Sequence, residues 1–157
     1  MINPLTSPLL TDLYQLTMME TYLQNGMDKT AVFEFYVRKL PEKRGFLIAT
    51  GLNSVLSFLE NLQFSSAEID YLAKTGRFSQ KLLDYLSSCR FCGDVYALPE
   101  GTVCFANEPL IRVVAPLPMA QLVETRLMNF LHFETMIASK AARCVLAAGG
   151  KRLVDFG

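Results

Sequence analysis

The sequence lacks the features on which several protein classes depend. Fifteen basic and fifteen acidic residues leave no net charge, so the basic surface of a nucleic-acid-binding protein is missing. The most apolar stretches are interrupted by charged residues and prolines, well short of the ~20 residues that a membrane span needs. The N-terminus has no basic segment followed by an apolar run, as a signal peptide would. We therefore expect small molecules or a second copy of the chain as partners, with no nucleic acid and no membrane.

Metal ligands are also scarce. The single histidine is His132, and of the four cysteines only Cys89 and Cys92 have Cys-x-x-Cys spacing. A zinc site needs a second pair of ligands, and none follows at the spacing of a zinc finger or zinc ribbon. We expect no metal site, and reduced, mostly buried thiols of a cytoplasmic protein.

The chain has ample material for a core. Its 157 residues are 51% hydrophobic and 11% aromatic, which suits about one packed domain. The mean hydropathy of +0.25 is high for a soluble monomer, so we expect some apolar surface to meet another part of the protein or a second subunit.

Apolar periodicity and turn residues predict a mixture of helices and strands. The signals are a glycine stop at Gly26, a proline after the first strand at Pro41, and a capping signal from Ser65, Ser66 and Glu68. The predicted helices cover residues 9–25, 52–62, 67–73 and 80–86, the first strand covers 30–38, a second apolar run covers 45–50, and residues 93–115 are expected to form a three-stranded meander.

A long helix is predicted from Met119 to Ala148, with Pro118 at its N-terminus and Gly149-Gly150 ending it. Residues 151–156 would form the next strand, so the two together suggest the first step of an α/β barrel. A polar stripe within about 80° of arc runs along this helix, facing either water or a ligand. Its members are Thr125, Asn129, His132, Ser139 and Arg143.

Five segments together resemble a known family. They are Leu-Leu-Thr-Asp-Leu-Tyr-Gln-Leu-Thr-Met at residues 9–18, Phe-Tyr-Val-Arg-Lys-Leu-Pro at 35–41, Gly-Asp-Val-Tyr-Ala-Leu-Pro-Glu-Gly-Thr at 93–102, Ile-Ala-Ser-Lys-Ala-Ala-Arg at 137–143 and Leu-Val-Asp-Phe-Gly at 153–157. In this order they resemble the N-terminal portion of the nicotinate phosphoribosyltransferases, which are type II phosphoribosyltransferases.

The resemblance implies an α+β fold. Residues 1–117 would form an N-terminal α/β domain of the hammerhead kind. Residues 118–157 would begin an irregular, TIM-like α/β barrel that is incomplete in this chain. The active site would lie where two subunits of a homodimer meet.

The resemblance also implies the reaction. Nicotinate and phosphoribosyl pyrophosphate would give nicotinate mononucleotide and pyrophosphate in NAD salvage, with ATP hydrolysis coupled through a phosphorylated histidine and Mg²⁺ near the phosphates. That histidine and the phosphate-handling residues are expected beyond Gly157, so the catalytic residues are unknown here. We expect this chain alone to be inactive and to bind neither Mg²⁺ nor ATP by itself.

Two residues carry most of the implied binding site. Tyr14 matches the family's ring-binding tyrosine, and a phenol offers a flat face for a pyridine ring. Arg143 matches the arginine of the family's Ala-Ala-Arg segment, and its planar fork suits a carboxylate or a phosphate. The structural alternatives are a core aromatic for Tyr14 and an interface ion pair for Arg143. We interpret Asp12 as the N-cap of the first helix or as a partner behind the site.

Ser139 and Lys140 flank Arg143 and join it as expected substrate-binding residues, although Lys140 lies about 60° away around the helix. We expect Arg38 and Lys39 to be solvated. No role carries over to His132, which we expect to be buried and hydrogen-bonded. An alternative to the enzyme is a non-enzymatic module that keeps this fold for dimerisation or regulation.

Overall fold

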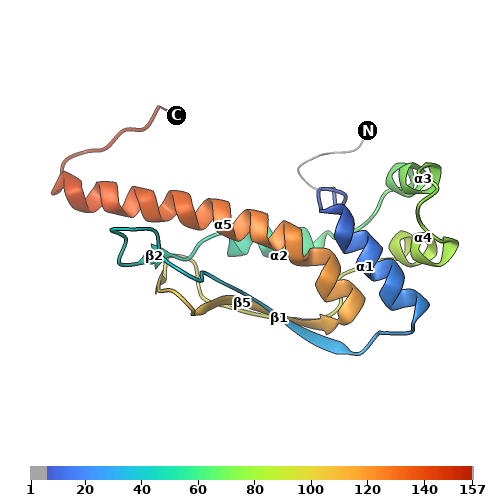
Figure 1. The fold of residues 1–157 in the computed structure, drawn as a ribbon. Coiled ribbons are helices and arrows are strands. Elements are labelled where there is room, and N and C mark those ends of the chain that lie inside the picture. The colour runs from blue at the N-terminus through green and yellow to red at the C-terminus, as the bar shows by residue number, and fades with distance from the viewer. Residues whose placement is uncertain (1–6, 157) are drawn as a thin grey trace.

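The computed structural model describes residues 7–156. Helix α1 (Leu13–Gln24) and strand β1 (Thr30–Tyr36) come first, followed by the short strand β2 (Leu47–Ile48) and three helices, α2 (Leu52–Glu60), α3 (Ser66–Lys74) and α4 (Gln80–Ser87). Strands β3 (Asp94–Ala97), β4 (Val103–Cys104) and β5 (Pro109–Pro116) then lead into the long helix α5 (Leu117–Ala148). Figure 1 shows α5 running along the molecule, with α1 across its first part and α3 and α4 beyond α1.

The helix predictions are confirmed, with changes at their ends. The first helix starts at Leu13, because residues 8–11 form a turn and a bend before it, and Gly26 follows its end with a φ of 64°. Ser65 and Glu68 form a complete capping box in which each side chain accepts from the other residue's backbone N–H. Helix α5 starts at Leu117 with Pro118 in its first turn, and Gly149 ends it in the left-handed conformation.

The strands form, but the predicted meander is wrong. Strand β5 is the centre of a three-stranded antiparallel sheet of order β1-β5-β3, whereas β4 leaves that sheet and pairs with β2. The cause is a pair of backbone hydrogen bonds between segments that are far apart in the sequence. Ala49 N–H donates to Thr102 O at 2.8 Å, and Gly101 N–H donates to Ala49 O at 2.8 Å, which holds β4 beside β2.

The strand predicted over residues 151–156 is also absent. This segment has no regular structure, and its residues are exposed. A strand is stabilised by hydrogen bonds to a neighbour, and none of the strands that the structure describes pairs with this segment. Helix, strands and sheet make the chain a mixed α+β structure, while the hammerhead and barrel details, and the boundary after residue 117, stay predictions.

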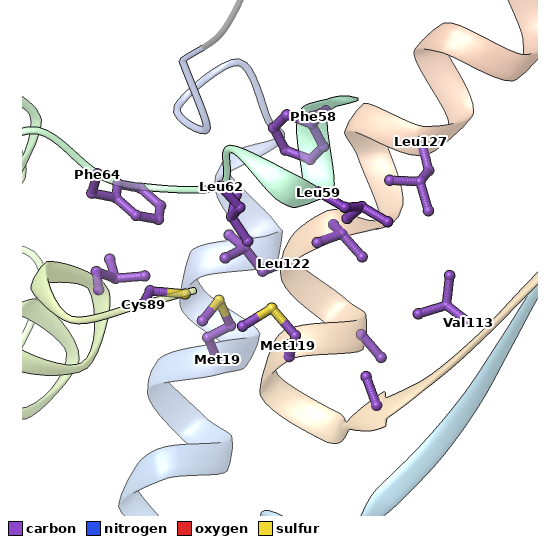
Figure 2. Packing of buried hydrophobic residues seen from close by; sticks show 14 of the residues in the cluster. Met19, Phe58, Leu59, Leu62, Phe64, Cys89, Val113, Met119, Leu122 and Leu127 are labelled. Atoms are coloured by element: carbon purple, nitrogen blue, oxygen red, sulfur yellow. The ribbon is translucent and has the colours of Figure 1, made fainter. Parts of the chain in front are cut away.

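One main core joins most elements. Figure 2 shows Met19 of α1 and Met119 of α5 facing each other, with Leu59 and Leu62 from the α2 region and Leu122 of α5 around them. A smaller cluster of Leu47, Ala49, Cys104 and Leu110 lies under the middle of α5, next to Met136. The first half of α5 thus belongs to the core of the preceding residues.

Gly93 is required where β3 starts beside β5. Its φ is 150°, and an added Cβ would lie 2.6 Å from Val114 O and 2.8 Å from Ala115 Cβ. Backbone strain and overpacking should together cost Gly93→Ala roughly 2–5 kcal/mol in the free energy of unfolding. The matched control is Gly45→Ala, because an added Cβ there meets nothing within 4 Å. Equal urea midpoints for the two variants would contradict this account.

Candidate active site

Tyr14 lies on α1 where this helix meets the start of α5. Tyr14 is 46% exposed, which does not fit the alternative of a core aromatic, and its role in binding a pyridine ring stays a prediction. Its hydroxyl accepts a hydrogen bond from Gln15 Nε2 at 2.9 Å. Burial of the hydroxyl end, followed by the negative charge of Glu124, raises the pKa of Tyr14. The ring is therefore accessible, while the neutral hydroxyl is turned toward α5.

Asp12 occupies the N-cap position of α1, as predicted, but its side chain caps no backbone N–H. Its Oδ2 instead accepts a hydrogen bond from Thr125 Oγ1 at 2.9 Å. Asp12 therefore ties the start of α1 to α5, close to Tyr14.

Two buried glutamines lie behind Tyr14. Gln15 belongs to the segment at residues 9–18, but nothing in the sequence predicts its burial, and Gln121 lies in none of the five segments that resemble the family. Gln15 is 0% exposed and Gln121 is 3% exposed. Gln121 Nε2 donates to Gln15 Oε1 and, at 3.0 Å, to Glu124 Oε2, while its own Oε1 accepts from the Tyr22 hydroxyl at 3.2 Å. The amides are thus satisfied by partners on both helices, as buried polar groups require.

The predicted polar stripe does not act as one surface. Thr125 is half-buried against α1, Asn129 and His132 are exposed, Ser139 is buried, and Arg143 is exposed. The expectation that His132 is buried is wrong, because it lies on the side of α5 that the sheets and the other described helices leave uncovered. It lines an open hollow with Arg126, Asn129, Phe133 and Glu134 among others.

Ser139 joins α5 to β2. Its hydroxyl accepts from Ile48 N–H at 2.8 Å and donates to Thr135 O at 2.5 Å. One helical turn earlier, Thr135 Oγ1 donates to Thr50 O at 3.1 Å. The structure therefore uses Ser139 to fix α5 on the β2 segment, and its expected role in substrate binding stays a prediction.

Arg143 and Lys140 lie together despite their angular separation. They line one open hollow with Arg44, Cys144 and Ala147 near the C-terminal end of α5. Arg44 comes from the loop after β1, and its Nη1 lies 3.7 Å from Met136 Sδ, which places its guanidinium against α5. Three cationic side chains around one hollow can bind a carboxylate or a phosphate. Arg38 and Lys39 are exposed on the same loop, as predicted.

Tyr14 and this cationic hollow are far apart within one chain. Tyr14 lies beside Glu124 and Thr125, and Arg143 follows Thr125 by eighteen residues on the same helix. At 1.5 Å per residue, that separation is about 27 Å along α5. Figure 1 shows the two ends accordingly, with α1 across the first part of α5 and the far end extending past β2. One nicotinate molecule cannot touch both residues of the same chain.

Further expectations concern metals, thiols and membranes. Among residues 7–156, no three histidine, cysteine, aspartate or glutamate side chains come together as a metal site would need. All four cysteines are free, but only Cys89 and Cys104 are buried, so the prediction of mostly buried thiols holds for half of them. Burial raises the pKa of Cys89 to about 11. No helix in this part of the chain is long and apolar enough to cross a membrane.

Comparisons with known proteins agree with these motifs. Residues 9–132 match the family model for the nicotinate phosphoribosyltransferase N-terminal domain. A nicotinate phosphoribosyltransferase of Mycobacterium tuberculosis is 49% identical over 95% of this chain and 32% of its own length. That of Bacillus subtilis is 40% identical over 94% of this chain and 30% of its own length.

A solved structure shows the same architecture. The crystal structure of human nicotinic acid phosphoribosyltransferase matches with a TM-score of 0.83 and 35% identity, covering 94% of this chain and 30% of that one. The chain thus spans about a third of the length of these relatives. Because both the family match and the shared fold agree, the chain belongs to the nicotinate phosphoribosyltransferase family and corresponds to its N-terminal domain.

Proposed function

We propose that this chain is the N-terminal part of an enzyme that joins nicotinate to phosphoribosyl pyrophosphate and releases pyrophosphate, in NAD salvage. The observation that carries the proposal is Tyr14. It lies in the segment matched by the family, and its ring is accessible while its hydroxyl accepts a hydrogen bond from Gln15, the next residue on α1. A fixed aromatic face is what a flat pyridine ring needs for stacking.

The cationic hollow supplies the second half of the proposed site. Displacement at the ribose anomeric carbon develops positive charge on the sugar and negative charge on the departing pyrophosphate. Arg143, Lys140 and Arg44 would bind the nicotinate carboxylate or a phosphate, with Ser139 fixing the helix that carries two of them. Basic side chains at such a site favour the reaction by positioning the substrate and stabilising the leaving group.

The separation of Tyr14 from Arg143 supports a site shared by two subunits. If a homodimer pairs Tyr14 of one chain with Arg143 of the other, each active site receives one residue from each chain. Exposed apolar side chains on both regions are consistent with such an interface. They are Leu13 and Met18 on α1, and Phe133, Ile137, Val145 and Leu146 on α5.

Mg²⁺ and ATP are part of the proposed reaction of the complete enzyme, where the metal would neutralise phosphate charge. The residues described here bring together no set of metal ligands, so we assign no step through either group to this chain. We propose that the chain works in the cytoplasm, consistent with its free cysteines.

The proposal is tested by comparing this chain with the complete protein that contains it. The complete protein should release pyrophosphate only when both nicotinate and phosphoribosyl pyrophosphate are present, and it should form nicotinate mononucleotide. The isolated 157-residue chain should show no turnover, because it spans about a third of the length of its relatives and the family resemblance places the phosphate-handling residues and the phosphorylated histidine outside it. For each protein, a coupled assay measures the release of pyrophosphate, and chromatography of the product detects nicotinate mononucleotide. Inactivity of the complete protein would favour the non-enzymatic alternative.

A further inference from the structure

The polar network behind Tyr14 is more extensive than packing of two helices requires. Gln15 is completely buried, and its Nε2 lies within hydrogen-bond distance of three acceptors. These are the Tyr14 hydroxyl at 2.9 Å, Thr125 Oγ1 at 3.0 Å and Glu124 Oε2 at 3.3 Å. A buried polar side chain costs free energy unless its partners are well placed, so an apolar residue would join α1 to α5 more simply.

Each member of the network holds the next in one orientation. Gln121 Nε2 donates to Gln15 Oε1 and so fixes the Gln15 amide. Gln15 Nε2 is then directed at Tyr14 and Thr125. Thr125 in turn donates to Asp12, so its oxygen faces Gln15 as an acceptor. The Tyr14 hydroxyl is thus held against α5 by the Gln15 side chain, which is itself held by hydrogen bonds to Gln121 and Thr125.

We propose that Gln15 and Thr125 are positioning residues that hold the Tyr14 hydroxyl against α5 and thereby present its ring in one fixed orientation to nicotinate. This inference rests on the proposed function. Its physical basis is preorganisation: a ring that is already ordered loses less conformational entropy when a ligand stacks on it. Tyr14 is about half exposed and would otherwise move between rotamers.

The test is a double-mutant cycle in the complete protein. Gln15→Met keeps the length of the side chain and removes the amide. Losing one hydrogen bond of about 0.5–1.5 kcal/mol should raise the KM for nicotinate roughly 2- to 13-fold, with kcat little changed. In a Tyr14→Phe background, where the hydroxyl is already absent, the same substitution should change this KM by less than about twofold.

A matched control is available on the same helix. Gln24→Met removes an exposed amide whose Nε2 donates to Glu20 Oε1, and it should leave the KM for nicotinate unchanged. If Gln15→Met fails to fold by circular dichroism, Thr125→Val tests the same link, because it removes the hydroxyl that joins Gln15 to Asp12 and keeps the shape of the side chain. The same loss of effect is expected in the Tyr14→Phe background.

The outcomes separate this inference from the proposed function. Equal fold-changes in KM in the parental and Tyr14→Phe backgrounds would show that the network acts independently of the hydroxyl, which overturns the positioning role. An unchanged KM for Gln15→Met in the parental background would overturn it as well. If Tyr14→Ala itself leaves the KM for nicotinate unchanged, the proposed binding site fails, whatever the cycle shows.

Discussion

Tyr14→Ala in the complete protein should raise the KM for nicotinate, or lower kcat/KM, by about 5- to 160-fold. The estimate follows from about 1–3 kcal/mol for the loss of one aromatic stacking partner. The structure makes Tyr14 suitable for this test, because its ring is 46% exposed and contributes little to the buried core. Folding should therefore survive the substitution, and the kinetic effect should report on the substrate.

Two further variants distinguish a role of Tyr14 in stacking from a structural role. Tyr14→Phe keeps the ring and loses only the hydroxyl held by Gln15, so it should lose less activity than Tyr14→Ala. Tyr71→Ala is the matched control, since Tyr71 is a 58% exposed tyrosine on α3, away from α5. If Tyr14→Ala unfolds the protein while Tyr14→Phe behaves as the parent, Tyr14 is a structural residue and the stacking role is wrong.

Mixing two impaired variants should restore activity. In a two-fold dimer with shared sites, a hybrid of Tyr14→Ala and Arg143→Ala subunits has one site with both residues intact and one site with both replaced. If the two variants mix at random, about half of the dimers are hybrids, so roughly a quarter of the parental sites should return. Steady-state kinetics after verified subunit exchange measure the recovery.

The mixing experiment depends on the distance between Tyr14 and Arg143 within one chain. Tyr14, on α1, lies beside the first part of α5, whereas Arg143 lies near the C-terminal end of α5, so the two cannot contact one nicotinate within a chain. The control is a mixture of Tyr14→Ala subunits with subunits that carry both substitutions, because no site in that mixture has an intact Tyr14. If exchange is verified and the first mixture is no more active than the unmixed variants, the shared site is wrong and Arg143 has a structural or unrelated role.

Local features of the fold were predictable because their signals are local. The capping box of Ser65 and Glu68 and the glycine stop at Gly149 mark helix ends within a few residues of sequence. The pairing of β4 with β2 was not predictable in this way. It depends on hydrogen bonds between Ala49 and the segment around Thr102, which are far apart in the chain.

Some residues of the candidate site could likewise be predicted from the sequence, and others could not. Tyr14 and Arg143 were found through short segments that resemble a family, and Lys140 through its position next to Arg143. Arg44 was missed because only the folded loop brings it to α5. Buried glutamines such as Gln15 were missed because glutamine is usually exposed, and its burial depends on a partner over a hundred residues away.

The most direct test of the shared site is a crystal structure of the complete protein with nicotinate bound. We expect the pyridine ring to stack on the exposed face of Tyr14, with Arg143 of the partner subunit on the same side of the ligand and the Tyr14 hydroxyl still held by Gln15. A nicotinate ring bound away from Tyr14, or one contacted by Tyr14 with no Arg143 from either subunit nearby, would contradict the account.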